Sequence, residues 1–386
     1  MKKFRKICYI LFIISIFIKY ISAKYSYFVE TFYSRGIDVY IVKLLSKISS
    51  IFDFSCFEIM IYIFSISVVL SVVYLICRAF KDRCSFFESL KNILLNYLAC
   101  ACLIYFLFIL LWGVNYNRVS LEDSIKEEYS ESNDRDISKV SFDKDDLADL
   151  YKLLIDKCNE SRKTVDSLNS EPKNNIREIK NIILELENGY DNVELLNLNE
   201  LGKYSKAKTI LSSKWLSYTN ITGIYSPFTG EANINTNQPL VSIPFTVLHE
   251  MAHQRGYGNE SDANFLSYIA CIENKNPYAN YSGYFMALRY TASALSKVDY
   301  DAFVLLTKDI DDEVLEDIDN YSKFWEKYQG KVNEVSDNVN NLYLKSNRVK
   351  EGTKSYGKVV DLLLLYYYLY GWKTLRSLNN YIFIKF

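Results

Sequence analysis

Two stretches of about 20 residues without a charged side chain limit the fold of this chain more than any other feature. Residues 59–77 and 92–112 contain only apolar and uncharged polar side chains. A helix of this length crosses the hydrocarbon core of a bilayer. We therefore predict transmembrane helices at about residues 57–77 and 92–112.

A third apolar stretch, residues 7–23, is shorter and contains Lys19. Four basic residues precede it: Lys2, Lys3, Arg5 and Lys6. Cleaved signal peptides share this arrangement with retained anchors, and Ser22 and Ala23 would supply the small residues of a cleavage region. A lysine near a helix end can extend to the interface, and further spans follow, so we favour a retained helix. Residues 1–113 then form a membrane anchor of about three transmembrane helices.

Basic residues predict the orientation of these spans, because loops rich in Lys and Arg stay in the cytoplasm. The amino-terminal cluster is one such group. A second comprises Arg78, Lys81, Arg83 and Lys91. Four further basic residues between the first two spans reduce the contrast: Lys24, Arg35, Lys43 and Lys47. We expect a multi-pass protein of the cell membrane, with everything after Trp112 on the extracytoplasmic side.

From Arg118 the chain becomes charged and polar, as in a domain outside the membrane. Apolar residues recur at helical spacing in 147–154, and the chain after Gly256 reads as helical almost throughout. Residues 221–235 are instead rich in β-branched, aromatic and turn residues. The fold class is therefore mainly α: transmembrane helices, then a mostly helical domain (residues 114–386) with a small β-hairpin or edge sheet.

Charge and cysteine usage exclude other classes of protein. The chain has 45 basic and 46 acidic residues and no basic patch interleaved with aromatics, so we expect no nucleic-acid partner. No CxxC occurs, which argues against a thiolate metal site or a redox motif. Outside the apolar third only Cys158 and Cys271 remain. A disulfide could join them, but we favour two buried free thiols.

The strongest chemical signal is the pair of histidines, His249 and His253, which are the only two in the chain. Positions i and i+4 share one face of a helix, so both imidazoles can bind one zinc ion. Glu250 can then act as general base toward the water that the metal activates. Chance would give this pattern in roughly one chain in a few thousand.

The context favours a buried helix over a surface helix with two solvated histidines. Pro244 suits a first helical turn, and Gly256 suits the position just past a helix end. A helix that includes Val247, Leu248 and Ala252 is mostly buried, so its histidines need partners.

A catalytic zinc site needs a third protein ligand, and no histidine remains. The nearest carboxylates are Glu260 and Asp262; the thiol of Cys271 is a weaker alternative. Asn259 and Asp262 also fit a helix cap. Asn259 stands where metzincins need their third histidine, which excludes that family. We favour Glu260 as the third ligand and keep Asp262 as the alternative.

Several segments together resemble a bacterial membrane family of unknown function, DUF3810. They are residues 226–235, 244–256, 260–265, 281–290 and 355–364, and with the amino-terminal spans they cover nearly the whole chain. That family is similar to gluzincin-type zinc peptidases, in which HExxH and the first glutamate of a downstream E-x-x-A-(D/N) pattern bind the metal. The resemblance implies one Zn²⁺ ion on His249, His253 and Glu260 in a zincin-like catalytic domain. It implies no substrate.

Peptide hydrolysis also needs a donor to the oxyanion. Four candidates lie in the resembling segments: Tyr284, Arg289, Tyr290 and Tyr356. We single out Tyr284 and Arg289 as stabilisers of the transition state, although a tyrosine in a chain with 33 of them often only packs. Asn233 and Asn235 alternate with apolar residues, as on a half-exposed edge strand that would pair with an extended substrate. An ordinary hairpin is the alternative.

These observations predict a membrane-anchored zinc metallopeptidase with Glu250 as its general base. Its partners would be the lipid bilayer and a peptide or protein substrate. The alternative is a membrane-anchored zinc-binding scaffold or binding module without peptidase activity. Cleavage inside the membrane is disfavoured, because residues 235–275 are too polar and interrupted for a span.

Overall fold

The computed structural model describes residues 2–133, 137, 140–168, 175–346 and 357–371. The helical elements of the first half are α1 Lys2–Ser22, α2 Ser26–Phe28, η1 Val29–Ile37, α3 Asp38–Ser49, α4 Cys56–Lys81, α5 Arg83–Leu111, η2 Gly113–Asn117, α6 Leu121–Asn133, α7 Lys144–Ser167, α8 Ile176–Glu185 and η3 Leu195–Leu201. Those of the second half are α9 Ser213–Ser217, η4 Leu240–Ser242, α10 Ile243–Gln254, α11 Glu260–Ile272, α12 Pro277–Val298, α13 Tyr300–Thr307, α14 Asp312–Glu326, α15 Lys331–Ser346, α16 Lys358–Tyr366 and η6 Tyr367–Gly371. The strands are β1 Lys208–Thr209, β2 Gly223–Ser226 and β3 Glu231–Ile234.

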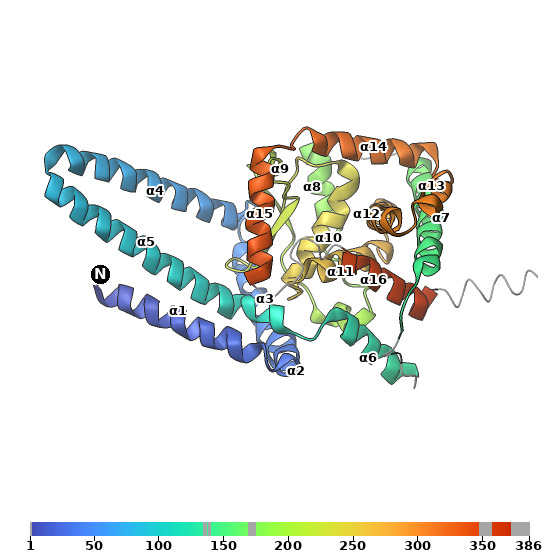
Figure 1. Ribbon diagram of the computed structural model, residues 1–386, viewed down its shortest axis with the longest axis horizontal. Helices are drawn as coiled ribbons and strands as arrows, with labels where there is room; N and C mark the ends of the chain where they lie inside the picture. The colour runs from blue at the N-terminus through green and yellow to red at the C-terminus, as the bar shows by residue number, and fades with distance from the viewer. Residues whose placement is uncertain (1, 134–136, 138–139, 169–174, 347–356, 372–386) are drawn as a thin grey trace, which may run out of the picture.

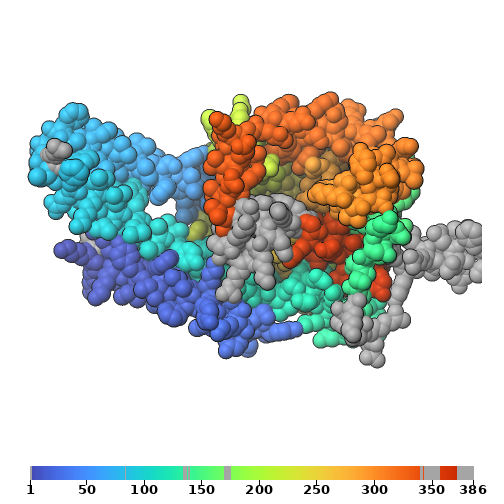
Figure 2. Space-filling model, viewed as in Figure 1, coloured from blue at the N-terminus to red at the C-terminus, as the bar shows by residue number. Residues whose placement is uncertain are grey.

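Helices α1, α4 and α5 form an elongated arm that projects from the rest of the molecule (Figures 1 and 2). Helices α4 and α5 are long and apolar enough to cross a membrane, as predicted for 57–77 and 92–112. Helix α1 meets that criterion only together with the helical stretch Ser26–Ser49, which bends from it by 107°. The number of candidate spans in the described residues is therefore two, or up to three if that bent pair counts as one.

The two basic clusters lie toward the same end of the arm. The amino terminus and the turn between α4 and α5 both point away from the remainder of the chain (Figure 1). Arg5 fixes α1 against α5, because its guanidinium donates to Oδ1 of Asn96 at 2.9 Å and to the carbonyl of Asn92 at 3.0 Å. The opposite end of the arm joins the polar part of the chain.

The expected hairpin is present, but it belongs to a three-stranded sheet with the order β1-β3-β2. Strands β2 and β3 are antiparallel, with Gly223 opposite Ile234 and Tyr225 opposite Ala232. Strand β1 pairs with β3 in parallel. Strand β3 is therefore central, and β2 is an edge strand beside helix α10, which contacts both β2 and β3.

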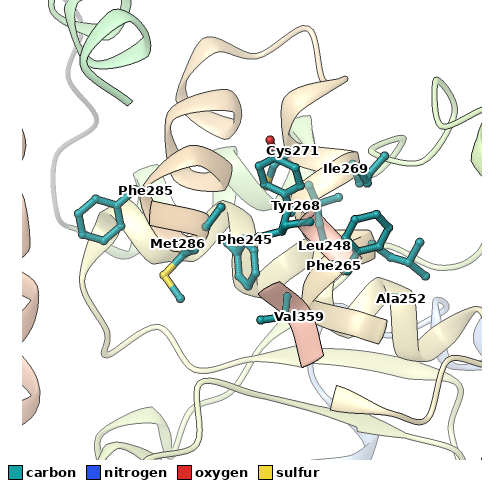
Figure 3. Packing of buried hydrophobic residues seen from close by; sticks show 14 of the residues in the cluster. Phe245, Leu248, Ala252, Phe265, Tyr268, Ile269, Cys271, Phe285, Met286 and Val359 are labelled. Carbon is teal, nitrogen blue, oxygen red and sulfur yellow. The ribbon is translucent and has the colours of Figure 1, made fainter. Parts of the chain in front are cut away.

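The main core lies where α10, α11, α12 and α16 meet (Figure 3). It includes Leu248 of α10, Phe265 of α11, Phe285 of α12 and Val359 of α16, all of them buried. Helices α10 and α11 are apolar on most of their surface, so they can be enclosed on nearly all sides. The same core contains Cys158 and Cys271, and both are buried free thiols.

Contacts cross the expected boundary at residue 113. Lys208 and Glu231 form an ion pair at 2.6 Å, with side chains 1% and 0% exposed. Glu231 also accepts the backbone N–H groups of Cys56 and Phe57, at the first turn of α4. A carboxylate at a helix amino terminus satisfies unpaired N–H groups and the helix dipole. One buried carboxylate thus joins the sheet to the start of a candidate span.

Candidate metal centre

Helix α10 carries His249, Glu250 and His253 as the sequence predicts. Pro244 lies in its first turn, where a missing N–H costs nothing. Gly256 follows its end with φ of +83°, a conformation that favours glycine. The chain then turns directly into α11, where the Asn259 side chain accepts the N–H of Ser261 and caps the helix. This short turn brings Glu260 back to the histidines.

The metal triad, His249, His253 and Glu260, forms a compact set of donors. Nε2 of His249 lies 3.2 Å from Oε2 of Glu260, and Nε2 of His253 lies 3.8 Å from Oε1. The three donor atoms all lie within 4.8 Å of one another. Ligands about 2.0–2.1 Å from a tetrahedral zinc ion lie about 3.3 Å apart, so small side-chain movements would close the set. These residues fit a zinc ion with a fourth position open.

Hydrogen bonds and charges hold the triad in place. The Nδ1 atom of His253 lies 2.6 Å from the carbonyl of Tyr257, which directs Nε2 toward Glu260. Burial lowers the pKa of His253, but the hydrogen bond and charge of Glu260 outweigh it and raise that pKa to about 9. Burial opposes ionisation of Glu260, yet both histidines hold its pKa well below the usual value. Nδ1 of His249 is buried without a hydrogen-bond partner in the described part of the chain.

Glu250 is buried between α10 and the edge strand β2. The backbone N–H of Tyr225 in β2 acts to lower the pKa of this carboxyl group. A Cβ atom on Gly223 would lie 2.5 Å from Oε1 of Glu250, closer than any normal contact, so only glycine leaves room there. Burial raises the pKa of Glu250, although both histidines act in the opposite direction. A raised pKa suits a general base near neutral pH.

The prediction that Asn233 and Asn235 form an exposed edge is wrong. Strand β3 is paired on both sides, and both asparagines are 0% exposed. The Asn233 amide donates to the carbonyl of Ile224 at 3.2 Å, and the Asn235 amide to that of Ile221 at 2.8 Å. Both side chains therefore stabilise the hairpin from within.

Of the three candidate oxyanion donors in the described residues, Tyr290 is the one whose contacts lie one helical turn from the triad. Its hydroxyl lies 3.3 Å from Oδ1 of Asn264, which is one turn beyond Glu260 on α11. Its ring packs against Phe245, which is one turn before His249 on α10. Residues one turn apart on a helix are neighbours, about 5–6 Å between Cβ atoms.

The other candidates lie elsewhere. Tyr284 packs on Tyr268, eight residues beyond Glu260 and thus roughly 12 Å along the helix. The Arg289 guanidinium lies over the ring of Tyr321 at 3.7 Å. Tyr356 lies outside the described residues.

Asp262, the alternative ligand, is not part of the donor set found at the triad. Burial raises the pKa of Asp262 to about 7, although the charge of Arg118 acts in the opposite direction. Asp262 therefore belongs to the surroundings of the metal triad. Of the two carboxylates considered, Glu260 reaches both histidines.

The amino-terminal part of the chain also forms one wall of the site, which was not among the predictions. The ring of Trp112, directly after α5, lies 6.0 Å from the His253 ring and 4.7 Å from the Tyr225 ring. Arg118 donates to the carbonyl of Gly256 at 3.0 Å and pairs with Glu30 at 2.7 Å. The turn between α10 and α11 is thus held by residues that lie beside the arm. A tryptophan at the end of a span was the available signal, since tryptophan is common at membrane interfaces.

A cavity of about 280 Å³ lies apart from the triad, among α7, α12 and α14. Its polar lining is already satisfied, because Asp317 pairs with Arg162 at 2.9 Å and accepts the Tyr281 hydroxyl at 2.5 Å. No unpaired charge there calls for a ligand. The triad is the stronger candidate site on chemical grounds.

Comparison with known proteins agrees with the resemblance noted from the motifs. A family model described as a protein of unknown function (DUF3810) matches residues 33–364. Neither the curated proteins nor the solved structures gave a match. The matched segment includes the metal triad, Glu250, Trp112 and the sheet, and it spans well over half of the chain. The chain therefore belongs to the DUF3810 family.

Proposed function

We propose that this chain is a membrane-anchored zinc-dependent peptidase with Glu250 as its general base. The observation that carries the proposal is the donor set of His249, His253 and Glu260, with atoms within 4.8 Å of one another, beside a buried second carboxylate. A purely structural metal site has no use for that second carboxylate. The side chains of the triad are 11–25% exposed, which leaves a path for a substrate.

Each neighbouring residue has a distinct role in this proposal. A bound zinc ion would act as a Lewis acid and would lower the pKa of a water molecule. Glu250 accepts the proton of the attacking water, and the close approach of Gly223 in β2 keeps its carboxylate in position. The Tyr290 hydroxyl donates to Asn264 at 3.3 Å and would turn from that oxygen to donate to the oxyanion.

The edge strand β2 offers a binding mode for a peptide. It is paired on one side, with β3, and the backbone of Gly223 lies against Glu250. An extended peptide could add to the open side by backbone hydrogen bonds. Such pairing would place a carbonyl near the general base whatever the side chains of the peptide.

We also propose that the site faces the extracytoplasmic side. Both basic clusters lie toward the end of the arm that is remote from the triad (Figure 1). Basic segments stay in the cytoplasm, so the triad would be across the membrane from them.

The test combines metal analysis with cleavage by the full-length protein in detergent. Zinc would be quantified, and a peptide library would be incubated with wild type, Glu250→Gln and His249→Ala. We expect one zinc per wild-type chain and per Glu250→Gln chain, with cleavage by wild type alone; His249→Ala should lose both. Absence of stoichiometric zinc in wild type would refute the proposal. Zinc without cleavage in any preparation would favour the scaffold.

A further inference from the structure

The helical stretch Ser26–Ser49, made of α2, η1 and α3, has an inner face fixed to the metal-binding part of the chain. The Asn115 amide donates to Asp38 of this stretch at 3.1 Å. A Cβ atom on Gly230, in the turn of the hairpin, would lie 2.8 Å from the backbone nitrogen of Ser46. The stretch therefore packs closely on the sheet and cannot move independently of it.

The outer face of the same stretch is apolar and exposed. It comprises Phe28, Phe32, Ile37, Tyr40, Leu44 and Ile48, each at least 53% exposed. The spacing of three or four residues is broken once, between Phe32 and Ile37. There the chain is a π-helix, Val29–Ile37, whose extra residue per turn keeps both side chains on one side. We call these six residues the interfacial face.

The charges on the exposed surface of this stretch are all positive. Its exposed side chains include Arg35 and Lys47 and no acidic residue. Its two acidic residues are turned inward: Asp38 is 1% exposed, and Glu30 pairs with Arg118 at 2.7 Å. Apolar and aromatic side chains flanked by Lys and Arg are typical of helices that lie in the interfacial layer of a membrane.

The geometry relative to the arm agrees with such a position. Helix α1 packs along α5, and the stretch Ser26–Ser49 bends from α1 by 107°. With the arm across the bilayer, the stretch runs close to the membrane plane. Leu211 lies at the same depth, at the start of the candidate span α4. It is 81% exposed, and its N–H donates at 2.9 Å to Glu58 in the first turn of α4.

We propose that the interfacial face is embedded in the headgroup and upper acyl layer of the bilayer, on the side where the metal triad lies. The occupant of this surface is lipid, because the face continues the apolar surface of the arm. Anionic headgroups would pair with Lys47, since Arg35 is already paired with Glu30 at 2.9 Å. The inner contacts then hold the triad beside the membrane surface. If the proposed peptidase function also holds, its substrates are segments that lie at this surface.

Photocrosslinking in membranes tests this placement without using zinc or activity. Leu44, 60% exposed, would be replaced by p-benzoylphenylalanine in the full-length protein, with Phe32 as a second position. Leu305 of α13 is a matched control, since it is 65% exposed and α13 lies at the end of the molecule opposite the arm (Figure 1). Leu70 of the candidate span α4, 62% exposed, is the positive control. The vesicles would contain phosphatidylethanolamine and phosphatidylglycerol.

We expect phospholipid adducts at Leu44, Phe32 and Leu70 after irradiation, and none above background at Leu305. Adducts at Leu70 without adducts at Leu44 and Phe32 would overturn the proposal. Crosslinked dimers through Leu44 in place of lipid adducts would also overturn it and would assign the face to a second copy of the chain. Either outcome leaves the zinc and cleavage tests of the proposed function unaffected.

Discussion

Replacing Gly223 with alanine tests whether the position of Glu250 matters for catalysis. The added Cβ atom would lie 2.5 Å from Oε1, 2.6 Å from Cγ and 2.8 Å from Cδ of Glu250. Ordinary contacts begin near 3.4 Å, so the carboxylate must move by about 1 Å. A displacement of about 1 Å can cost roughly 100-fold in rate, within the 10²–10⁴-fold that a general base contributes.

We expect Gly223→Ala to lower kcat/KM for a cleaved peptide by about 100-fold, or about 2.7 kcal/mol in the barrier. Zinc content should stay at the wild-type level, because the metal triad is not touched. Gly357→Ala is the matched control, since a Cβ atom there meets no atom of the described residues within 4 Å. A Gly223→Ala protein that binds zinc and cleaves at the wild-type rate would refute this account of the site.

Four further predictions follow from contacts at and near the triad. Glu260→Gln should weaken zinc binding by more than the roughly 100-fold lost with an outer-sphere partner, as measured by competition with a chelator. In the metal-free protein the pKa of His253 is raised to about 9, so zinc binding at pH 7 should release about one proton. Affinity should therefore increase with pH up to about 9, and calorimetry in buffers of different ionisation heat measures the release. Tyr290→Phe should lower kcat with unchanged zinc content; an unchanged kcat would exclude its hydroxyl as the donor. Glu231→Gln leaves Lys208 unpaired in a buried position and should destabilise the fold by about 3–5 kcal/mol. Denaturant unfolding in detergent measures this loss; an unchanged free energy of unfolding would mean that the ion pair contributes little to stability.

The local parts of the site could be predicted from the sequence. Helical periodicity, Pro244 and Gly256 define α10, and the i, i+4 spacing of the histidines fixes their common face. Glu260 follows the turn so closely that few other carboxylates can reach the same point. Short-range geometry determines all of these features.

The long-range parts could not be predicted in this way. Strand β1 has two residues, Lys208–Thr209, too few for a period-2 pattern, so β3 looked like an edge. Tyr284 and Tyr290 are six residues apart on one helix, which rotates them by about 240° relative to each other, and only the packing of α12 shows which of them faces α10. The contacts of Trp112 and Arg118 with the site join segments that are remote in sequence, so no local pattern specifies which residues they meet.

The position of Trp112 makes the candidate site depend on the attachment of the domain to the arm. It is the residue directly after α5, and its ring lies beside that of His253. A proteolytic cut between the arm and the domain would separate Trp112, or helix α5 that holds it, from helix α10 with its two histidines. Arg118 and Glu30, which hold the adjoining turn, would be parted by the same cut. Such a cut would therefore remove this wall of the candidate site, and the proposed activity would require the intact chain.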